Sequence, residues 1–237
     1  MLIFYDIIYK NKSAQSLGVY VKERPSFPVP ERDKTFTTIP GRSGSLVTDD
    51  GTYSDVTISI KFNFVDEDEN AIGKVFRAAK AWLLSAGSGR MVVSDDTNVF
   101  HIVKDVTITD SDRTAKIGHA FTAKFRLDPY TYLASGDSEI SLPAALYNQY
   151  EPCEPVYKIE GEGVCTITTT SGTVTANIGQ NLTIDCANRM SYRTDTGVRN
   201  NIALTGDMED LMIPTGLFNI SLSSGFTGTV TPHWRAV

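Results

Sequence analysis

Hydrophobic and polar residues alternate strictly over residues 56–64 (VTISIKFNF). This period of two is typical of a β-strand that buries one side and exposes the other. Residues 121–127 (FTAKFRL) alternate in the same way, and two further apolar runs, MVVS and VFHIVKDVTITD, flank a DDTN turn at residues 95–98. The first half of the chain is therefore predicted to contain a β-sheet.

A turn signal precedes the first of these strands. Asp50-Gly51 favours the two-residue hairpin turn in which both central residues have positive φ. We therefore expect residues 43–48 (SGSLVT) to pair back onto the strand at 56–64.

One helix is predicted between the strands. The acidic run DEDEN supplies an N-cap near Asp66 and negative charge for the first turn. The following apolar residues recur at spacings of three and four: Ile72, Val75, Phe76, Ala79, Trp82 and Leu83. Gly87 is expected to stop the helix, and the apolar stripe is expected to pack on the sheet.

The second half of the chain has short strand-like segments separated by Gly, Asn and Ser, with no helical pattern. They are VYKIEG, CTITTT, TVTANIG, LTIDCA, FNISLS and GTVTPHW, and they predict an antiparallel β-sandwich. Residues 134–152 contain proline and small polar residues without a pattern. The sequence thus predicts a mainly β protein: an N-terminal sandwich or rolled sheet with one flanking α-helix in residues 1–133, a junction at 134–152 and a β-sandwich at 153–237.

The charge distribution also favours two units. Residues 1–133 hold 17 basic and 17 acidic residues, whereas residues 134–237 hold 5 and 11. The second half is a poor candidate for binding phosphate backbones, because that affinity comes largely from clustered Lys and Arg. A solubilising acidic surface explains its charge better than an acidic-ligand role.

Composition limits the setting in which the chain works. No apolar run approaches the roughly 20 residues that span a bilayer, so we expect no membrane insertion. No charged segment followed by an apolar stretch opens the chain, so we expect no export by a signal peptide. The three cysteines lack C-x-x-C spacing and are expected to stay reduced.

The sequence offers little catalytic or metal-binding chemistry. His101, His119 and His233 lie far apart and have no metal-ligand spacing with other residues. Nucleophile-elbow, Walker and dinucleotide-binding motifs do not occur in the sequence. We therefore expect no catalytic, cofactor-binding or metal-binding residues, no cofactor, and a protein that is not an enzyme.

Several segments, in the same order, resemble the distal tail (Dit) proteins of long, non-contractile-tailed bacteriophages. In the first half these are ERPSFPVPERD, IPGRSGSL, DDGTYSDVTISIKFNF, the amphipathic helix and FRLDPYTY; in the second half they are LTIDCANRMSYR, LTGDMEDLMIPTGLFNISLSSG and the terminal TVTPHWR. The last resembles a Pro-x-Trp-Arg ending of that family. His233 stands where arginine is frequent there, and MIPTGLFN is slightly longer than the usual turn.

This resemblance implies a structural hub. It implies a tail-tube-like N-terminal domain that closes a hexameric ring around a channel, and a galectin-like C-terminal domain that projects outward. The implied partners are the tail tube protein on one face and the tail-tip protein on the other, with receptor-binding or baseplate proteins at the rim in some phages. DNA would pass through the lumen only in transit. The implied location is the distal end of the tail in the virion, after assembly in the host cytoplasm.

Two other functions stay open from the sequence. A galectin-like domain could be a carbohydrate-binding adhesion module, for which Trp234 and Tyr192 are the plausible aromatic platforms; both lie in strand-like segments where a core position is more common. The chain could also be another tail tube or baseplate subunit.

The proline-rich segment at residues 24–41 is the candidate for contacts between subunits. Pro28, Pro30 and Pro40 prevent a regular helix, so an extended segment could reach a neighbour. The alternative is a surface loop folded on its own domain. Gly41 and Gly44 would let the backbone bend on both sides of Arg42, which is either a contact in the ring or a solvated turn residue.

Overall fold

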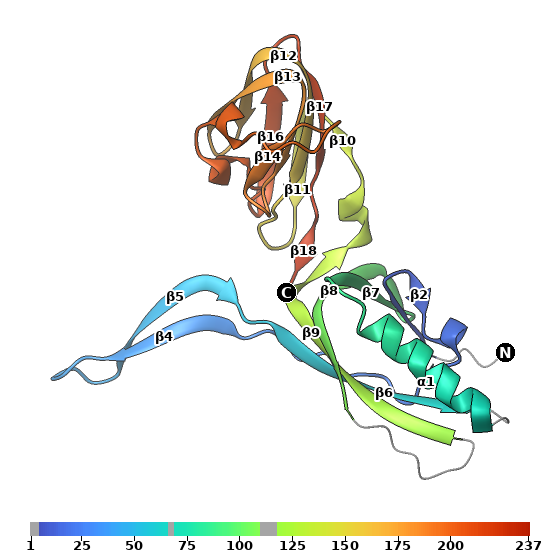
Figure 1. Ribbon diagram of the computed structural model, residues 1–237. Coiled ribbons are helices and arrows are strands. Elements are labelled where there is room, and N and C mark those ends of the chain that lie inside the picture. Colours follow the sequence, from blue (N-terminus) through green and yellow to red (C-terminus); the bar gives the residue numbers. More distant parts are fainter. Residues whose placement is uncertain (1–4, 66–68, 110–117) are drawn as a thin grey trace. The chain divides into compact units, whose positions relative to one another are not determined.

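The computed structural model describes residues 5–65, 69–109 and 118–237, and the chain divides into two compact units (Figure 1). Unit 1 comprises Met1–Thr131 together with Val237, and unit 2 comprises Tyr132–Ala236. Both are built mainly from antiparallel strands, and the described residues contain one α-helix. The prediction of a mainly β protein with one helix is confirmed.

Unit 1 is a curled antiparallel sheet whose strands follow the order β2-β1-β7-β8-β9-β6-β3. The bounds are β1 Ile7–Tyr9, β2 Lys12–Ser13, β3 Tyr20–Val21, β6 Val56–Val65, β7 Gly89–Val93, β8 Asp96–Ile108 and β9 Gly118–Leu133, with a 3-10 turn at Gln15–Leu17. Strands β6 and β9 pair from Val56 opposite Leu127 to Val65 opposite Gly118. Their alternating apolar residues all face the core, as the sequence pattern predicted.

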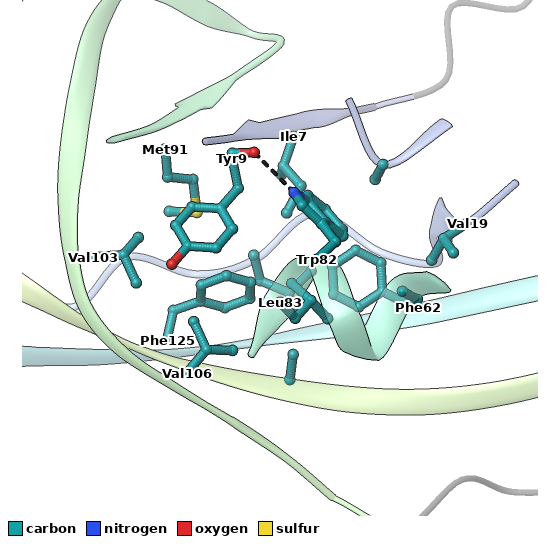
Figure 2. Packing of buried hydrophobic residues seen from close by; sticks show 14 of the residues in the cluster. Ile7, Tyr9, Val19, Phe62, Trp82, Leu83, Met91, Val103, Val106 and Phe125 are labelled. Atoms are coloured by element: carbon teal, nitrogen blue, oxygen red, sulfur yellow. Dashed lines mark hydrogen bonds between the residues drawn. The ribbon is translucent and has the colours of Figure 1, made fainter. Parts of the chain in front are cut away.

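Helix α1, Glu69–Leu83, packs its apolar stripe against this sheet. Ile72, Ala79, Trp82 and Leu83 are buried, while Val75 and Phe76 are partly buried against the same cluster. Figure 2 shows Trp82 among core residues of the sheet, with its indole N–H donating to the main-chain oxygen of Tyr9 at 2.8 Å. The expected N-cap near Asp66 lies outside the described residues.

Lys10 fixes the other end of this helix. Its ammonium group donates to the main-chain oxygens of Ser85, Ala86 and Gly87 at 2.7 to 2.9 Å. These carbonyls follow the last helical residue, where a cation complements the helix dipole. The helix ends at Leu83, four residues before the predicted stop at Gly87, and Gly87, with φ +80°, turns the chain in the loop that follows.

The hairpin predicted at Asp50-Gly51 is wrong. Both residues lie inside one continuous strand, β5 (Ser45–Tyr53), which pairs with β4 (Arg32–Thr38) and not with β6. Only Gly51 of the pair has positive φ, at +74°, and its N–H donates to the Asp49 carboxylate at 2.9 Å. The Asp-Gly pair therefore makes a local irregularity instead of the hairpin turn, which requires positive φ at two consecutive residues.

Unit 2 is an antiparallel sheet bent around its own core, centred on the long hairpin of β12 (Val156–Thr169) and β13 (Thr173–Asp185). The first part of β12 pairs with β17, and its last three residues pair with β16. One long strand therefore has two different neighbours along the same edge. Gly161 and Gly163, both with positive φ, lie between these two parts. Because β12 and β13 are continuous, four of the predicted short strands are in fact two long ones.

Shorter elements complete unit 2. The strands are β10 Ile140–Ser141, β11 Ala144–Asn148, β14 Met190–Tyr192, β15 Leu204–Thr205, β16 Gly216–Leu222, β17 Thr227–Thr231 and β18 Arg235–Ala236; 3-10 turns span Ala134–Asp137, Asn201–Ala203 and Met208–Leu211. Strands β10 and β11 fall in the stretch expected to be patternless and pair with β17 and β16.

The three cysteines, Cys153, Cys165 and Cys186, are buried in the core of unit 2 as free thiols. Among the described helices, none is both long and apolar enough to cross a membrane.

Candidate assembly surface

Strands β4 and β5 form a two-stranded ribbon that pairs with no other strand of the described chain (Figure 1). We call residues 32–53 the ribbon. Cross-strand partners include Lys34 with Asp49 and Phe36 with Val47. Almost every ribbon side chain is exposed, and a lone two-stranded hairpin is at best marginally stable in water. The ribbon is therefore suited to binding the surface of another protein.

Apolar side chains on the ribbon are open to solvent. Phe36 is 65% exposed and Val47, directly opposite it on the same face, is 50% exposed. Leu46 is 44% exposed and lies on the other face, opposite Thr37. Both faces of the ribbon thus present apolar groups beside threonines, which a contacting protein could cover.

The base of the ribbon is fixed by side chains. Arg32 donates from Nε to the Asp49 carboxylate at 2.9 Å, and its guanidinium lies 5.6 Å from the centre of the Tyr53 ring. Tyr53 in turn meets Tyr130 of β9 edge to face, with ring centres 6.0 Å apart. The Gly51 N–H and the Arg32 hydrogen bond hold the pKa of Asp49 below its usual value. These contacts define where the ribbon leaves the sheet.

The tip of the ribbon carries two of the four predicted contact residues. Pro40 and Arg42 lie in the connection between β4 and β5 and are exposed. Gly41 and Gly44 both have φ of +81°, which confirms that they bend the chain on either side of Arg42. Arg42 is the one charged residue between Lys34 and Asp49, and its guanidinium has no ion pair with the described residues.

The other two predicted residues, Pro28 and Pro30, lie in the irregular segment before the ribbon. They line a pocket of about 200 Å³ together with His101 and Leu127 of the same unit. The ring of Phe27 stacks on His101 with centres 4.8 Å apart, and burial lowers the pKa of that histidine despite Asp96 nearby. The structure therefore separates the four residues into two pairs, one against the sheet and one at the ribbon tip.

Sequence reasoning missed Phe36, Leu46 and Val47. Phe36 lies between threonines in TFTT, which fits a strand pattern, but Leu46 and Val47 are adjacent in SLVT and do not alternate with polar residues. That pattern carries no sign of whether the apolar side is buried. The available signal was the pair of strand-like segments on either side of a Pro-Gly turn.

The three histidines considered as metal ligands lie in different elements: His101 in β8, His119 in β9 and His233 just before β18. His101 stacks on Phe27, and His119 meets the ring of Phe64 edge to face at 5.5 Å. No group of three potential metal ligands occurs within residues 5–65, 69–109 and 118–237.

The terminal segment that resembles Pro-x-Trp-Arg is integrated into unit 2. Trp234 is half-buried against its core, and Arg235 binds the Glu154 carboxylate and the Pro152 main-chain oxygen, each at 2.7 Å. His233 has φ +54° and donates its main-chain N–H to Gly136. Tyr192, the other aromatic considered as a sugar platform, is also half-buried.

Comparison with known proteins identifies the fold. No protein-family profile matches the sequence, and no curated protein sequence is significantly similar to it. The structure is similar to the Dit protein of phage SPP1, with a TM-score of 0.75 at 13% identity over 98% of this chain and 99% of that one. It is also similar to a chain of the phage P2 baseplate in its activated conformation with calcium, with a TM-score of 0.50 at 14% identity over 97% and 98% of the two chains. Over nearly its whole length, therefore, the chain has the fold of a phage distal tail protein.

Proposed function

We propose that this protein is the structural hub at the distal end of a phage tail. The observation that carries the proposal is the match of both units, in one chain, to SPP1 Dit, a hub of the adsorption apparatus in phages that infect Gram-positive bacteria. The order of the sequence segments supports the same assignment. The role is assembly and connection, not catalysis.

The hub is a hexameric ring closed by unit 1. A ring needs a head-to-tail interface, in which one surface of each subunit meets a different surface of the next. The ribbon supplies one such surface, because its exposed Phe36, Leu46 and Val47 can be covered by the neighbouring subunit. Burying what remains exposed of these side chains would contribute about 2 to 3 kcal/mol per interface.

The predicted contact residues have different parts in this scheme. Pro40 and Arg42 at the ribbon tip touch the neighbour directly. Pro28 and Pro30 hold the start of the ribbon against its own sheet and border the interface. Unit 2, which holds the acidic excess, projects away from the ring.

The ring joins the tail tube protein on one face to the tail-tip protein on the other, and receptor-binding or baseplate proteins attach at its rim. DNA passes through its lumen during ejection without sequence-specific contacts. The protein accordingly resides in the virion after assembly in the host cytoplasm.

A shortened ribbon tests this proposal. Thr35 and Thr48 are paired, so residues 36–47 can be replaced by Asn-Gly, which favours a two-residue hairpin turn and leaves the Arg32–Asp49 contact in place. Light scattering should give six times the 26.0 kDa chain mass for the full chain and one times that mass for the variant. A hexamer with the shortened ribbon would reject the ribbon as the closing element, and a monomeric full chain at about 50 µM would count against the ring itself.

A further inference from the structure

The outward face of strands β11 and β16 in unit 2 carries an uncharged strip of side chains. Tyr147, 67% exposed, lies opposite Leu217, 59% exposed, and two residues along Ala145 lies opposite Asn219. Ser221 continues the strip and pairs with Thr168 on β12. The alternate residues Leu146, Phe218 and Ile220 are buried, so the strip points away from the core.

A groove of about 640 Å³ lies over the polar end of this strip, next to Tyr147 and Leu217. Its lining includes Ala144, Ala145, Thr168, Thr170, Asn219 and Ser221. The alanines leave room, while the threonines, serine and asparagine offer hydroxyl and amide groups. The groove is shallow and open to solvent, so a ligand would lie along it and would not be enclosed by it.

The polar end of the groove is held in place by main-chain contacts. The main-chain N–H of Asn219 donates to the Thr170 hydroxyl at 2.8 Å, and the main-chain oxygen of Asn219 accepts from the main-chain N–H of Thr170 at 3.1 Å. The Thr169 hydroxyl donates to the main-chain oxygen of Asp210 at 2.7 Å. The Asn219 amide group itself makes no hydrogen bond to the described residues, so both its donor and its acceptor remain available to a ligand.

The absence of acidic and basic residues decides which ligand fits. None of the six residues of the strip is Asp, Glu, His, Lys or Arg, although residues 134–237 hold 11 acidic and 5 basic residues. A phosphate-bearing polymer would find no cation here to balance it. A neutral pyranose ring has an apolar face that can lie on an aromatic side chain and hydroxyls that pair with amide and hydroxyl groups.

From these observations we propose that the β11–β16 face binds neutral oligosaccharides. One sugar ring lies on Tyr147, against Leu217, and its neighbour extends over Ala145 into the groove. Asn219, Thr168 and Ser221 hydrogen-bond the hydroxyls of that neighbour. This site is separate from Trp234 and Tyr192, and it does not depend on ring formation.

Saturation-transfer NMR on the full chain tests the site, with glucose tetramers and N-acetylglucosamine tetramers as probes. We expect transfer to at least one of them, a loss of affinity of about tenfold or more in Tyr147→Ala, and about fivefold in Asn219→Ala. Ile202→Ala, which truncates a side chain 95% exposed in the same unit, is the matched control and should bind as the wild type does.

Three results would overturn the proposal. The first is no transfer to either probe at about 10 mM, the weak end of measurable affinity. The second is unchanged binding in both Tyr147→Ala and Asn219→Ala, given circular dichroism like that of the wild type. The third is binding that soluble polyphosphate displaces, which would mean that charged groups elsewhere hold the ligand.

Discussion

The indole N–H of Trp82 donates to the main-chain oxygen of Tyr9 at 2.8 Å in the core of unit 1, and so ties helix α1 to strand β1 (Figure 2). Trp82 is 4% exposed and Tyr9 is 2% exposed. The two rings also lie 6.0 Å apart, and Tyr9 meets Phe125 edge to face. Trp82 of helix α1, Tyr9 of strand β1 and Phe125 of strand β9 thus form one connected group of rings in the core.

Trp82→Phe is expected to lower the free energy of unfolding by about 2 to 3 kcal/mol. The variant loses a buried hydrogen bond and leaves a cavity beside Tyr9. Urea unfolding followed by circular dichroism measures the change. Leu84→Ala, which truncates a side chain 54% exposed just beyond the helix, should stay within about 0.5 kcal/mol of the wild type. Equal midpoints for Trp82→Phe and wild type would show that this contact does not stabilise the unit.

A partly buried ion cluster beside the ribbon makes stability depend on pH. Asp55 accepts hydrogen bonds from Lys104 at 2.6 Å and Arg126 at 2.7 Å, and Lys104 also contacts Asp128. Burial alone would raise the pKa of Asp55, but the two cations outweigh it and lower the pKa. The folded state therefore favours ionised Asp55, and this contribution is present above the unfolded pKa of about 3.9 and lost as pH falls through the folded value.

Asp55→Asn should accordingly lower the free energy of unfolding by about 1 kcal/mol at pH 7. The difference from the wild type should shrink as the pH falls below about 4. Asp50→Asn, at an exposed ribbon position, is the control and should have little effect. Thermal unfolding between pH 3 and 7 measures both variants, and a difference that stays constant over this range would argue against a charge effect.

The cysteines of unit 2 should be unreactive until the protein unfolds. Burial raises the pKa of Cys153, Cys165 and Cys186, in the last case to about 12 with Asp185 and Glu154 adding to the effect. A disulfide reagent at pH 8 should modify none of them in the native protein and all three in guanidinium without reductant. A single reactive thiol after denaturation would indicate a disulfide.

How far the sequence predicts the structure depends on whether a pattern has a buried side. Strand β6 and helix α1 were predictable because each buries one apolar face, which fixes the period of hydrophobic residues. The ribbon buries neither face, and its apolar residues, among them the adjacent Leu46 and Val47, show no consistent period of two, so its pairing could not be inferred. The Asp50-Gly51 signal failed because Asp50 does not take positive φ. Strand β11 is only five residues long, too short for a clear period.

The candidate assembly residues were predictable only in part. Proline and glycine mark the ribbon tip through backbone restriction, which is local and readable, so Pro40 and Arg42 could be singled out. Phe36 and Val47 could not, because exposure depends on what the rest of the fold leaves uncovered. The packing of Pro28 and Pro30 beside His101 likewise depends on contacts between segments about 70 residues apart.

If the apolar pair on the ribbon closes the ring, polar replacements should open it. Phe36→Ser together with Val47→Ser should shift the hexamer toward monomers at low micromolar concentration without changing the circular dichroism spectrum. Ile202→Ser, on unit 2, should leave the hexamer intact. Sedimentation velocity distinguishes these outcomes, and a double variant that sediments as the wild type would remove this pair from the interface.

The ring itself is tested most directly by averaged electron-microscope images of the purified full chain viewed end on. We predict particles with sixfold symmetry and a central hole, and we predict that these particles are absent when residues 36–47 are replaced by Asn-Gly. Particles without a hole, a different symmetry, or single chains at all accessible concentrations would contradict the proposal that this protein forms the hub ring of a phage tail.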